Sequence, residues 1–180
     1  IAADLPAMER AFAGSALSER LTGLGRTARD VVASHAVGGV IGRAAGIGLD
    51  ARVFDPIYAD LGQVACLDRD GDAAARCRVR LGEMTESIRL IRTLLRIMPD
   101  GPVSTALPTT SGEGLGCAES GRGDVWHWIR LDHGQIAAVF PRDPGWASLG
   151  VAEAALADAA YEDVALIRAS LGLSSAGMDL

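Results

Sequence analysis

The run from residue 119 to residue 129 holds side chains that can handle charge and protons. Its letters are ESGRGDVWHWI, so Arg122 stands in a turn of small residues between two carboxylates, Glu119 and Asp124. A guanidinium is a permanent cation and can steady an anion or a protonatable group. His127 follows in the same run, and histidine is the side chain that changes charge near neutral pH. We therefore treat Arg122 and His127 as candidate catalytic residues, and Glu119 and Asp124 as candidates for the lining of a cofactor cavity.

Each of these residues also has a purely structural explanation. Arg122 could form a salt bridge with Glu119 or Asp124 that pins the turn, and His127 could be a core residue bonded to the backbone. Gly121 lies beside Arg122, and glycine has no φ restriction, so the turn is loosened at this point. The sequence leaves both explanations open.

The cysteines do not have the spacing of a metal site. Cys66, Cys77 and Cys117 contain no C-x-x-C pair, and the three histidines are scattered along the chain. An odd number of cysteines without a disulfide framework is typical of a reducing compartment. We therefore expect reduced thiols, a cytoplasmic location and no metal held by this chain.

The composition excludes several classes of protein. A chain of 180 residues fits one domain with a sizeable core, and its apolar content of 49% with only 4% aromatic residues favours closely packed helices. The net charge of −6 without a basic cluster argues against a nucleic-acid partner. No apolar run approaches the roughly 20 residues that cross a bilayer. Contact with a membrane would therefore come through partner subunits.

The strongest periodicity lies between residues 72 and 98. Apolar residues recur there at spacings of three and four, and Pro99 ends the pattern. We predict that this segment is the central helix of a bundle. Arg76, Arg80 and Glu83 lie on it, either as a solvated face or as the charge chain along the helix that the family resemblance given below implies for proton-coupled members.

Weaker patterns divide the rest of the chain. The predicted helices cover residues 4–22 with a weak point at Gly14, 28–34 with Thr27 as the cap, 149–160, and 162–171; residues 38–58 and 103–121 are predicted to be irregular. Alternation predicts an antiparallel hairpin of residues 125–131 and 135–140 with a turn at 132–134. The fold class is thus mainly α, of the α+β type: one domain over 1–180, with a helical bundle in 1–102, a loop and β-hairpin in 103–147, and C-terminal helices in 148–180.

Four blocks in order resemble the nickel–iron (NiFe) hydrogenase large-subunit superfamily. Residues 119–129 resemble its E-A-P-R-G-x-x-x-H-W-I signature, and residues 39–52 resemble G-P-x-x-R-A-S-G-x-x-x-D-x-R. Residues 71–87 are similar to G-D-x-x-A-R-x-x-V-R-x-x-E-M-x-x-S, and residues 98–102 to M-P-x-G-P. The resemblance is greatest to the quinone-site subunit of complex I, which is the D-type subunit of NADH:quinone oxidoreductase, and to the large subunits of formate hydrogenlyase-type membrane-bound hydrogenases. It covers the C-terminal portion of that family, over residues 38–171, and implies a hydrogenase large-subunit-like fold.

The end of the chain departs from the hydrogenase pattern. Hydrogenases of the superfamily end in D-P-C-x-x-C, whose two thiolates hold nickel, whereas Ser174 and Gly177 stand at those two positions here. Nickel in these enzymes needs four soft thiolate ligands. A serine hydroxyl stays protonated near neutral pH, and glycine has no side chain. The resemblance and this departure together imply a degenerate nickel site and no cofactor bound by the chain itself.

The resemblance implies a role in electron transfer. The expected function is that of a subunit of a membrane-associated NADH:quinone oxidoreductase or a hydrogenase-like, formate hydrogenlyase-type complex. An iron–sulfur small subunit and membrane subunits would be its partners, and quinone and iron–sulfur clusters would lie elsewhere in that complex. The chain would be cytoplasmic and peripheral to the inner membrane, and we do not expect it to be catalytic alone. The alternative is a non-catalytic scaffold or assembly protein derived from a hydrogenase large subunit.

Two structural expectations follow from this interpretation. In the superfamily the matching arginine leans over the metal cavity or the corresponding space in complex I, which implies that Arg122 points into a closed cavity beside Ser174. A scaffold would instead tie Arg122 to Glu119 or Asp124. High apolar content without a membrane span also predicts a large exposed apolar patch where the iron–sulfur subunit docks.

Overall fold

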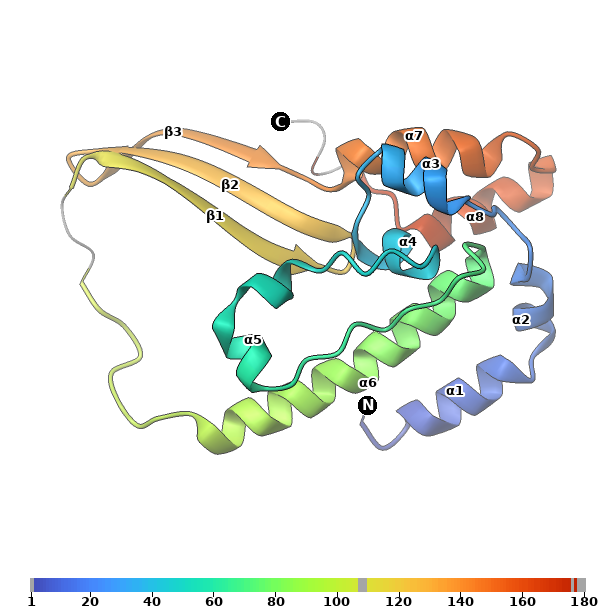
Figure 1. Cartoon of the computed structure of the whole chain (residues 1–180), viewed down its shortest axis with the longest axis horizontal. Coiled ribbons are helices and arrows are strands. Elements are labelled where there is room, and N and C mark those ends of the chain that lie inside the picture. Colours follow the sequence, from blue (N-terminus) through green and yellow to red (C-terminus); the bar gives the residue numbers. More distant parts are fainter. Residues whose placement is uncertain (1, 107–109, 176, 178–180) are drawn as a thin grey trace.

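The computed structural model describes residues 2–106, 110–175 and 177. It shows a body of helices from which a three-stranded sheet extends to one side (Figure 1). This arrangement confirms the α+β fold class, although the sheet is larger than the hairpin that the sequence predicts. The division at residues 102 and 147 stays a prediction. No helix of the described segments is long and apolar enough to cross a membrane.

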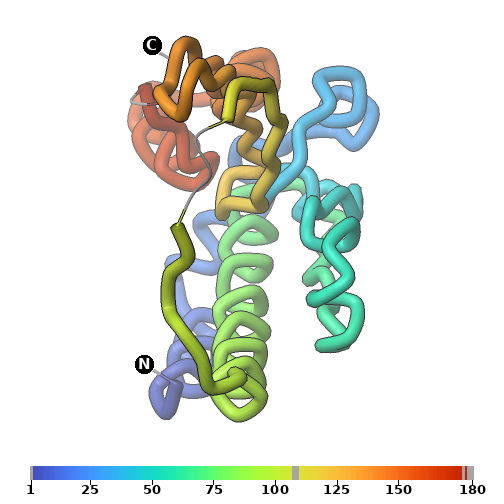
Figure 2. The backbone as a smooth tube through the Cα atoms, turned by 90° about the vertical axis from the view of Figure 1, so that its left-hand side faces the viewer, coloured from blue at the N-terminus to red at the C-terminus, as the bar shows by residue number. Residues whose placement is uncertain are grey.

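Helix α6, Ala73–Ile97, is the longest element of the fold and confirms the predicted central helix. It begins at Asp72, whose side chain accepts a hydrogen bond from the Ala75 backbone N–H at 2.7 Å. At 1.5 Å per residue its 25 residues span about 37 Å. Figure 2 shows α6 as the long axis of the body, with the N-terminal helices on one side and the η1–α5 segment on the other.

The N-terminal segment forms two helices, where the sequence predicts a single weak one. They are α1, Leu5–Ala13, and α2, Ala16–Leu21. Gly14 ends the first helix, and Ser15 caps the second by accepting from the Ser18 backbone N–H at 3.1 Å. The cap at Ser15 starts a second helix with a different direction. The apolar positions of residues 4–22 therefore do not follow the period of one continuous helix.

The segment between α2 and α6 contains more regular structure than predicted. It holds α3, Arg29–Ser34, α4, Gly39–Ala44, the 3₁₀ helix η1, Ala51–Phe54, and α5, Pro56–Asp60. The prediction that residues 38–58 are irregular is therefore wrong: these helices are too short to show a period, and side-chain caps from Asp50 and Asp55 start η1 and α5. Thr27 does not cap α3, because its hydroxyl donates to the Gly71 carbonyl at 3.0 Å.

The sheet contains β1, Gly112–Ser120, β2, Gly123–Asp132, and β3, Gln135–Arg142, paired antiparallel in the order β1-β2-β3. The predicted hairpin is confirmed, and its turn has positive φ at His133 and Gly134, as a two-residue hairpin turn requires. The prediction that residues 103–121 are all loop is wrong. Glycines disfavour a strand, but the continuous β1–β2 ladder from Gly112↔Leu131 to Ser120↔Gly123 satisfies the backbone of β1.

The C-terminal helices complete the core of the body. They are α7, Gly145–Leu156, and α8, Val164–Leu171, with the short 3₁₀ helix η2, Tyr161–Asp163, before α8. Both predicted helices are confirmed in type, with ends shifted by several residues. The main apolar cluster lies among α3, α4, α7 and α8 and includes Val32, Val37, Ile41, Val151, Ile167 and Leu171.

Candidate functional site: a buried arginine cluster beneath the Arg122 turn

Arg122 lies in the tight turn between β1 and β2 and is exposed. The turn is held by Ser120, whose hydroxyl accepts from the Arg122 backbone N–H at 3.2 Å and donates to the Gly123 carbonyl at 2.8 Å. Within the described residues, the Arg122 guanidinium has no ion pair or hydrogen bond. The expectation of a closed cavity and that of a salt bridge to Glu119 or Asp124 are both wrong for this chain. The catalytic role of Arg122 stays a prediction.

The two carboxylates that flank Arg122 in sequence bind other partners. The Glu119 side chain is only 5% exposed. Its Oε1 accepts from Arg43 Nη1 at 2.8 Å and its Oε2 from the Ala51 backbone N–H at 3.0 Å. Asp124 accepts from Arg142 Nη1 at 3.0 Å and from the Trp126 indole N–H. They therefore anchor the base of the sheet and are not available to pair with Arg122.

Arg43 is the centre of a buried group of charges. It is fully buried. Besides Glu119, Arg43 lies against Glu83 on α6, donates to the Leu49 carbonyl at 3.2 Å, and stands 3.6 Å from an Asp50 oxygen. Arg52 joins the group through its ion pair with Asp50. We call these five residues the Arg43 cluster: Arg43, Asp50, Arg52, Glu83 and Glu119.

The Arg43 cluster joins four segments of the chain into one site. Asp50 is fully buried, and it accepts hydrogen bonds from Arg52 Nε at 2.9 Å and Arg52 Nη2 at 2.6 Å. The members come from α4, the start of η1, α6 and β1. Three carboxylates face two guanidinium groups, so the cluster carries a net charge of −1 when all are ionised.

Burial and pairing act in opposite directions on the charges of this cluster. Burial by itself lowers the pKa of Arg43, but hydrogen bonding to Glu119 and the charges of Glu83 and Glu119 raise that pKa above its ordinary value. For Asp50, burial raises the pKa, and the hydrogen bonds and charge of Arg52 outweigh it, so the pKa is lowered. The ionised forms are thus the stable ones in the fold.

The Arg122 turn is seated directly on the start of α4. Gly39 has φ of +59°, and a Cβ built there would collide with the backbone of Arg122 and Gly123. Only glycine tolerates both this conformation and this contact. The Arg43 cluster, which holds Glu119 of β1, and the contact with Gly39 therefore fix the backbone of Arg122. The Arg122 side chain lies in solvent.

Arg76 and Arg80 do not form the expected charge chain with Glu83. Arg76 is fully buried; it donates to Ser170 Oγ at 3.0 and 3.1 Å and to the Gly71 and Gly25 carbonyls, both at 2.9 Å. Arg80 donates to the Ser170 carbonyl at 2.6 Å. Both cations therefore attach α6 to α8, whereas Glu83 belongs to the Arg43 cluster. The alternative prediction, that Arg76 lies on a solvent-exposed face of the helix, is also wrong, because Arg76 is fully buried.

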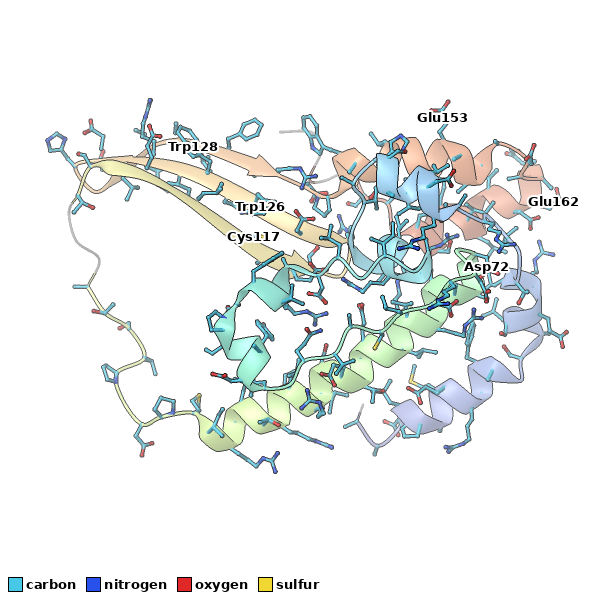
Figure 3. All side chains as sticks on the ribbon, viewed as in Figure 1. Asp72, Cys117, Trp126, Trp128, Glu153 and Glu162 are labelled. Carbon is cyan, nitrogen blue, oxygen red and sulfur yellow. The ribbon has the colours of Figure 1, made fainter. Side chains whose placement is uncertain are left out.

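His127 lies on β2 opposite Gly116 of β1 and is exposed. It is therefore not the core residue that the structural explanation requires, and it has no bond to Arg122. Cys117 and Trp126, which are labelled in Figure 3, are register partners on the other side of the sheet. Both line a pocket of about 470 Å³ that residues of η1 also line. A role of His127 in proton transfer stays a prediction.

Ser174 and Gly177 stand where hydrogenases of the superfamily have nickel-binding cysteines, and a degenerate nickel site stays a prediction. No group of three or more His, Cys, Asp or Glu side chains in the described segments could hold a metal ion, and the three cysteines are free. A Cβ built at Gly177 would collide with the Asp143 carboxylate. A thiolate at position 177 therefore has no room unless Asp143 moves.

The Arg43 cluster is the part of the site that sequence reasoning missed. Its members stand in three of the four blocks that carry the superfamily resemblance: residues 39–52, 71–87 and 119–129. The available signal was an arginine, Arg43, among small and apolar residues in the first of these blocks. The partners could not be assigned, because Arg43 and Glu119 are 76 positions apart.

Known proteins with related sequences and structures place these blocks in a family. The chain is 31% identical over 137 residues to the D subunit of the F(420)H(2) dehydrogenase of Methanosarcina mazei, and the match covers 75% of this chain and 36% of that protein. It is 40% identical over 86 residues to the H subunit of the chloroplastic NAD(P)H-quinone oxidoreductase of Solanum tuberosum, covering 47% of this chain and 22% of that protein.

A solved structure agrees with this placement. The fold matches a chain in the structure of the membrane-bound sulfane sulfur reductase, an archaeal respiratory membrane complex, with a TM-score of 0.89 and 26% identity, over 99% of this chain and 52% of that one. The present chain thus spans about a third of the first relative and half of the solved chain. The family profile of the respiratory-chain NADH dehydrogenase 49 kDa subunit matches residues 3–111. The chain therefore belongs to the family of the 49 kDa subunit of respiratory-chain NADH dehydrogenase.

Proposed function

We propose that this chain is part of a subunit of a membrane-associated NADH:quinone oxidoreductase or of a hydrogenase-like, formate hydrogenlyase-type electron-transfer complex, and that it holds no nickel of its own. An iron–sulfur small subunit and membrane subunits would be its partners, and it would be cytoplasmic and peripheral to the inner membrane. Family membership supports this proposal, because the relatives named above are quinone-linked oxidoreductases, dehydrogenases or respiratory complexes by name.

The convergence of the motif blocks on the Arg43 cluster carries the proposal. Those blocks supply a buried charge network whose local effect is to hold the Arg122 turn against α4. A fold that fixes a backbone this firmly, and gives its guanidinium no partner among the described residues, presents that cation to something outside the chain. We propose that a neighbouring subunit covers Arg122 in the assembled complex.

The chemical contribution of this chain would then be electrostatic. Covering Arg122 removes water from the guanidinium and strengthens its interaction with nearby charge, because the effective dielectric constant falls. A fixed cation there would stabilise negative charge that develops on a group held at the interface. Quinone and iron–sulfur clusters, which carry the redox chemistry in our proposal, would be held by the rest of the complex.

The alternative function is a non-catalytic scaffold or assembly protein. The exposure of Arg122 and His127 in the free chain favours this alternative, since neither residue is held by a catalytic partner. In a scaffold, the Arg43 cluster would serve only to join the sheet to the helical body.

Arg122→Ala in the whole complex separates these two functions. If the guanidinium stabilises developing charge, turnover with quinone or hydrogen should fall about a hundredfold, the size typical of losing one oriented donor. Arg130→Ala is the matched control, because Arg130 is an exposed arginine of β2, the strand that follows the Arg122 turn. Normal assembly with unchanged turnover in Arg122→Ala would leave the scaffold function as the better account.

A further inference from the structure

A groove between α1 and the second half of α6 lies away from the Arg122 turn. It has a volume of about 760 Å³ and apolar walls that include Leu5 of α1 and Ile88 and Leu95 of α6. One hydrogen bond crosses between the two helices, from Thr85 Oγ1 to Glu9 Oε1 at 3.0 Å. Figure 2 shows the two helices running side by side along the body.

The end of α6 beside this groove is covered by little of the described chain. Ile91 is 54% exposed, Leu95 is 66% exposed and Met98, just after the helix, is 69% exposed. Large apolar side chains that are exposed close together mark surfaces that other molecules cover. The spacing of Ile88, Ile91 and Leu95 places them along one side of the helix, which is the pattern of a helix–helix contact.

The charges that line this groove are mostly positive, although the whole chain has a net charge of −6. Arg89, Arg92 and Arg96 all line it. Arg89 is neutralised by Glu86 at 2.6 Å. Arg96 makes only a long hydrogen bond of 3.4 Å to Thr93, and Arg92 has no ion pair or hydrogen bond in the described part of the chain. Two cations beside an apolar surface are therefore without carboxylate partners among the residues that the structure describes.

We propose that this groove binds an amphipathic helix of the assembled complex, with an apolar stripe against Leu95 and carboxylates facing Arg92 and Arg96. Two neighbouring helices with apolar facing sides accept a third helix in the manner of a bundle. From Thr85 to Arg96 the groove follows 12 residues of α6, so the bound helix makes contact over about 18 Å, or roughly three turns. This inference goes beyond the proposed function, because it does not depend on Arg122 or on electron transfer.

Site-specific photo-cross-linking in the native complex tests this proposal. Leu95 is replaced by the photoreactive p-benzoylphenylalanine in the full-length protein, and the cross-linked peptide is identified by mass spectrometry. We expect a segment with apolar residues at spacings of three and four and at least two Asp or Glu residues on its flank. Arg92→Glu with Arg96→Glu should reduce the cross-linking yield about tenfold, since two exposed ion pairs are lost together.

Arg29→Glu with Arg130→Glu is the matched control, because both arginines are exposed and lie outside the groove. Reversing the charges of the identified carboxylates to Lys should restore the yield in the Arg92→Glu, Arg96→Glu variant. Cross-links to lipid, to a second copy of this chain, or to a segment without carboxylates would overturn the proposal. A yield that is equally insensitive to both double variants would overturn it as well.

Discussion

Arg43 on α4 and Arg76 on α6 are both fully buried, yet their charges are neutralised in different ways. Arg43 meets three carboxylates, whereas Arg76 meets the Ser170 hydroxyl and two backbone carbonyls. The pKa of Arg43 is accordingly raised by its carboxylates, and burial lowers the pKa of Arg76 to about 10. A pKa of about 10 still leaves Arg76 charged at neutral pH.

Arg43 thus neutralises buried carboxylates, whereas Arg76 supplies hydrogen bonds to uncharged oxygens. The oxygens around Arg76 are neutral, and if Arg76 is removed they lose hydrogen bonds but acquire no net charge. Asp50 would keep Arg52 if Arg43 is removed, but Glu83 and Glu119 would be left as anions in a buried environment. We therefore expect the Arg43 cluster to be the more sensitive of the two regions.

The largest effect is expected from Arg43→Met. Glu83 and Glu119 would lose their guanidinium partner in a buried environment, and the free energy of unfolding should fall by about 3–5 kcal/mol. Chemical denaturation of the variant measures this loss. Arg20→Ala is the control, since the Arg20–Asp163 ion pair is largely exposed on the Arg20 side, and it should cost about 1 kcal/mol or less. Equal losses in both variants would contradict the buried-network account.

A smaller effect is expected from Arg76→Met. The variant removes the Arg76 donors from the Gly25 carbonyl and the Ser170 hydroxyl, whereas the Gly71 carbonyl keeps its hydrogen bonds from Thr27. It creates no buried charge, so the loss should be about 1–3 kcal/mol. The same denaturation experiment compares it directly with Arg43→Met. If Arg76→Met proves the more damaging substitution, the distinction drawn between the two arginines is wrong.

The pH dependence of stability sharpens the comparison further. The pKa of Asp50 is lowered in the folded protein, so its contribution is fully present above the unfolded carboxyl pKa of about 4 and is lost as pH falls through the folded value. Asp50→Asn should therefore flatten the decrease in stability below about pH 4. Denaturation curves between neutral and acid pH measure the slope. An unchanged acid slope in the variant would show that Asp50 is not ionised in the way described.

The central helix and the hairpin could be predicted because their signals are local. Asp72 as the cap, the apolar period of α6 and the Asp132-His133-Gly134 turn all act over a few residues. Strand β1 could not be predicted, because Gly112 and Gly114 have poor strand propensity and the strand exists through its pairing with β2.

The candidate site was predictable only in part for the same reason. The run of residues 119–129 was identified from its side chains, and it does form the β1–β2 turn. The partners of Glu119 could not be identified from the sequence, since its ion pair with Arg43 joins segments that are far apart in the chain. The spacing in the sequence suggested that Glu119 or Asp124 pairs with the neighbouring Arg122. In the fold these carboxylates pair with the more distant Arg43 and Arg142.

The fold fixes the backbone of Arg122, and our central proposal is that a neighbouring subunit covers its guanidinium. Arginine-specific modification with phenylglyoxal, quantified by mass spectrometry in the free chain and in the assembled complex, tests it most directly. Exposed Arg29 and buried Arg43 serve as the reactive and unreactive internal standards. We predict that Arg122 reacts as readily as Arg29 in the free chain and becomes protected to the level of Arg43 on assembly. Equal reactivity of Arg122 in the free chain and in the complex would contradict the proposal.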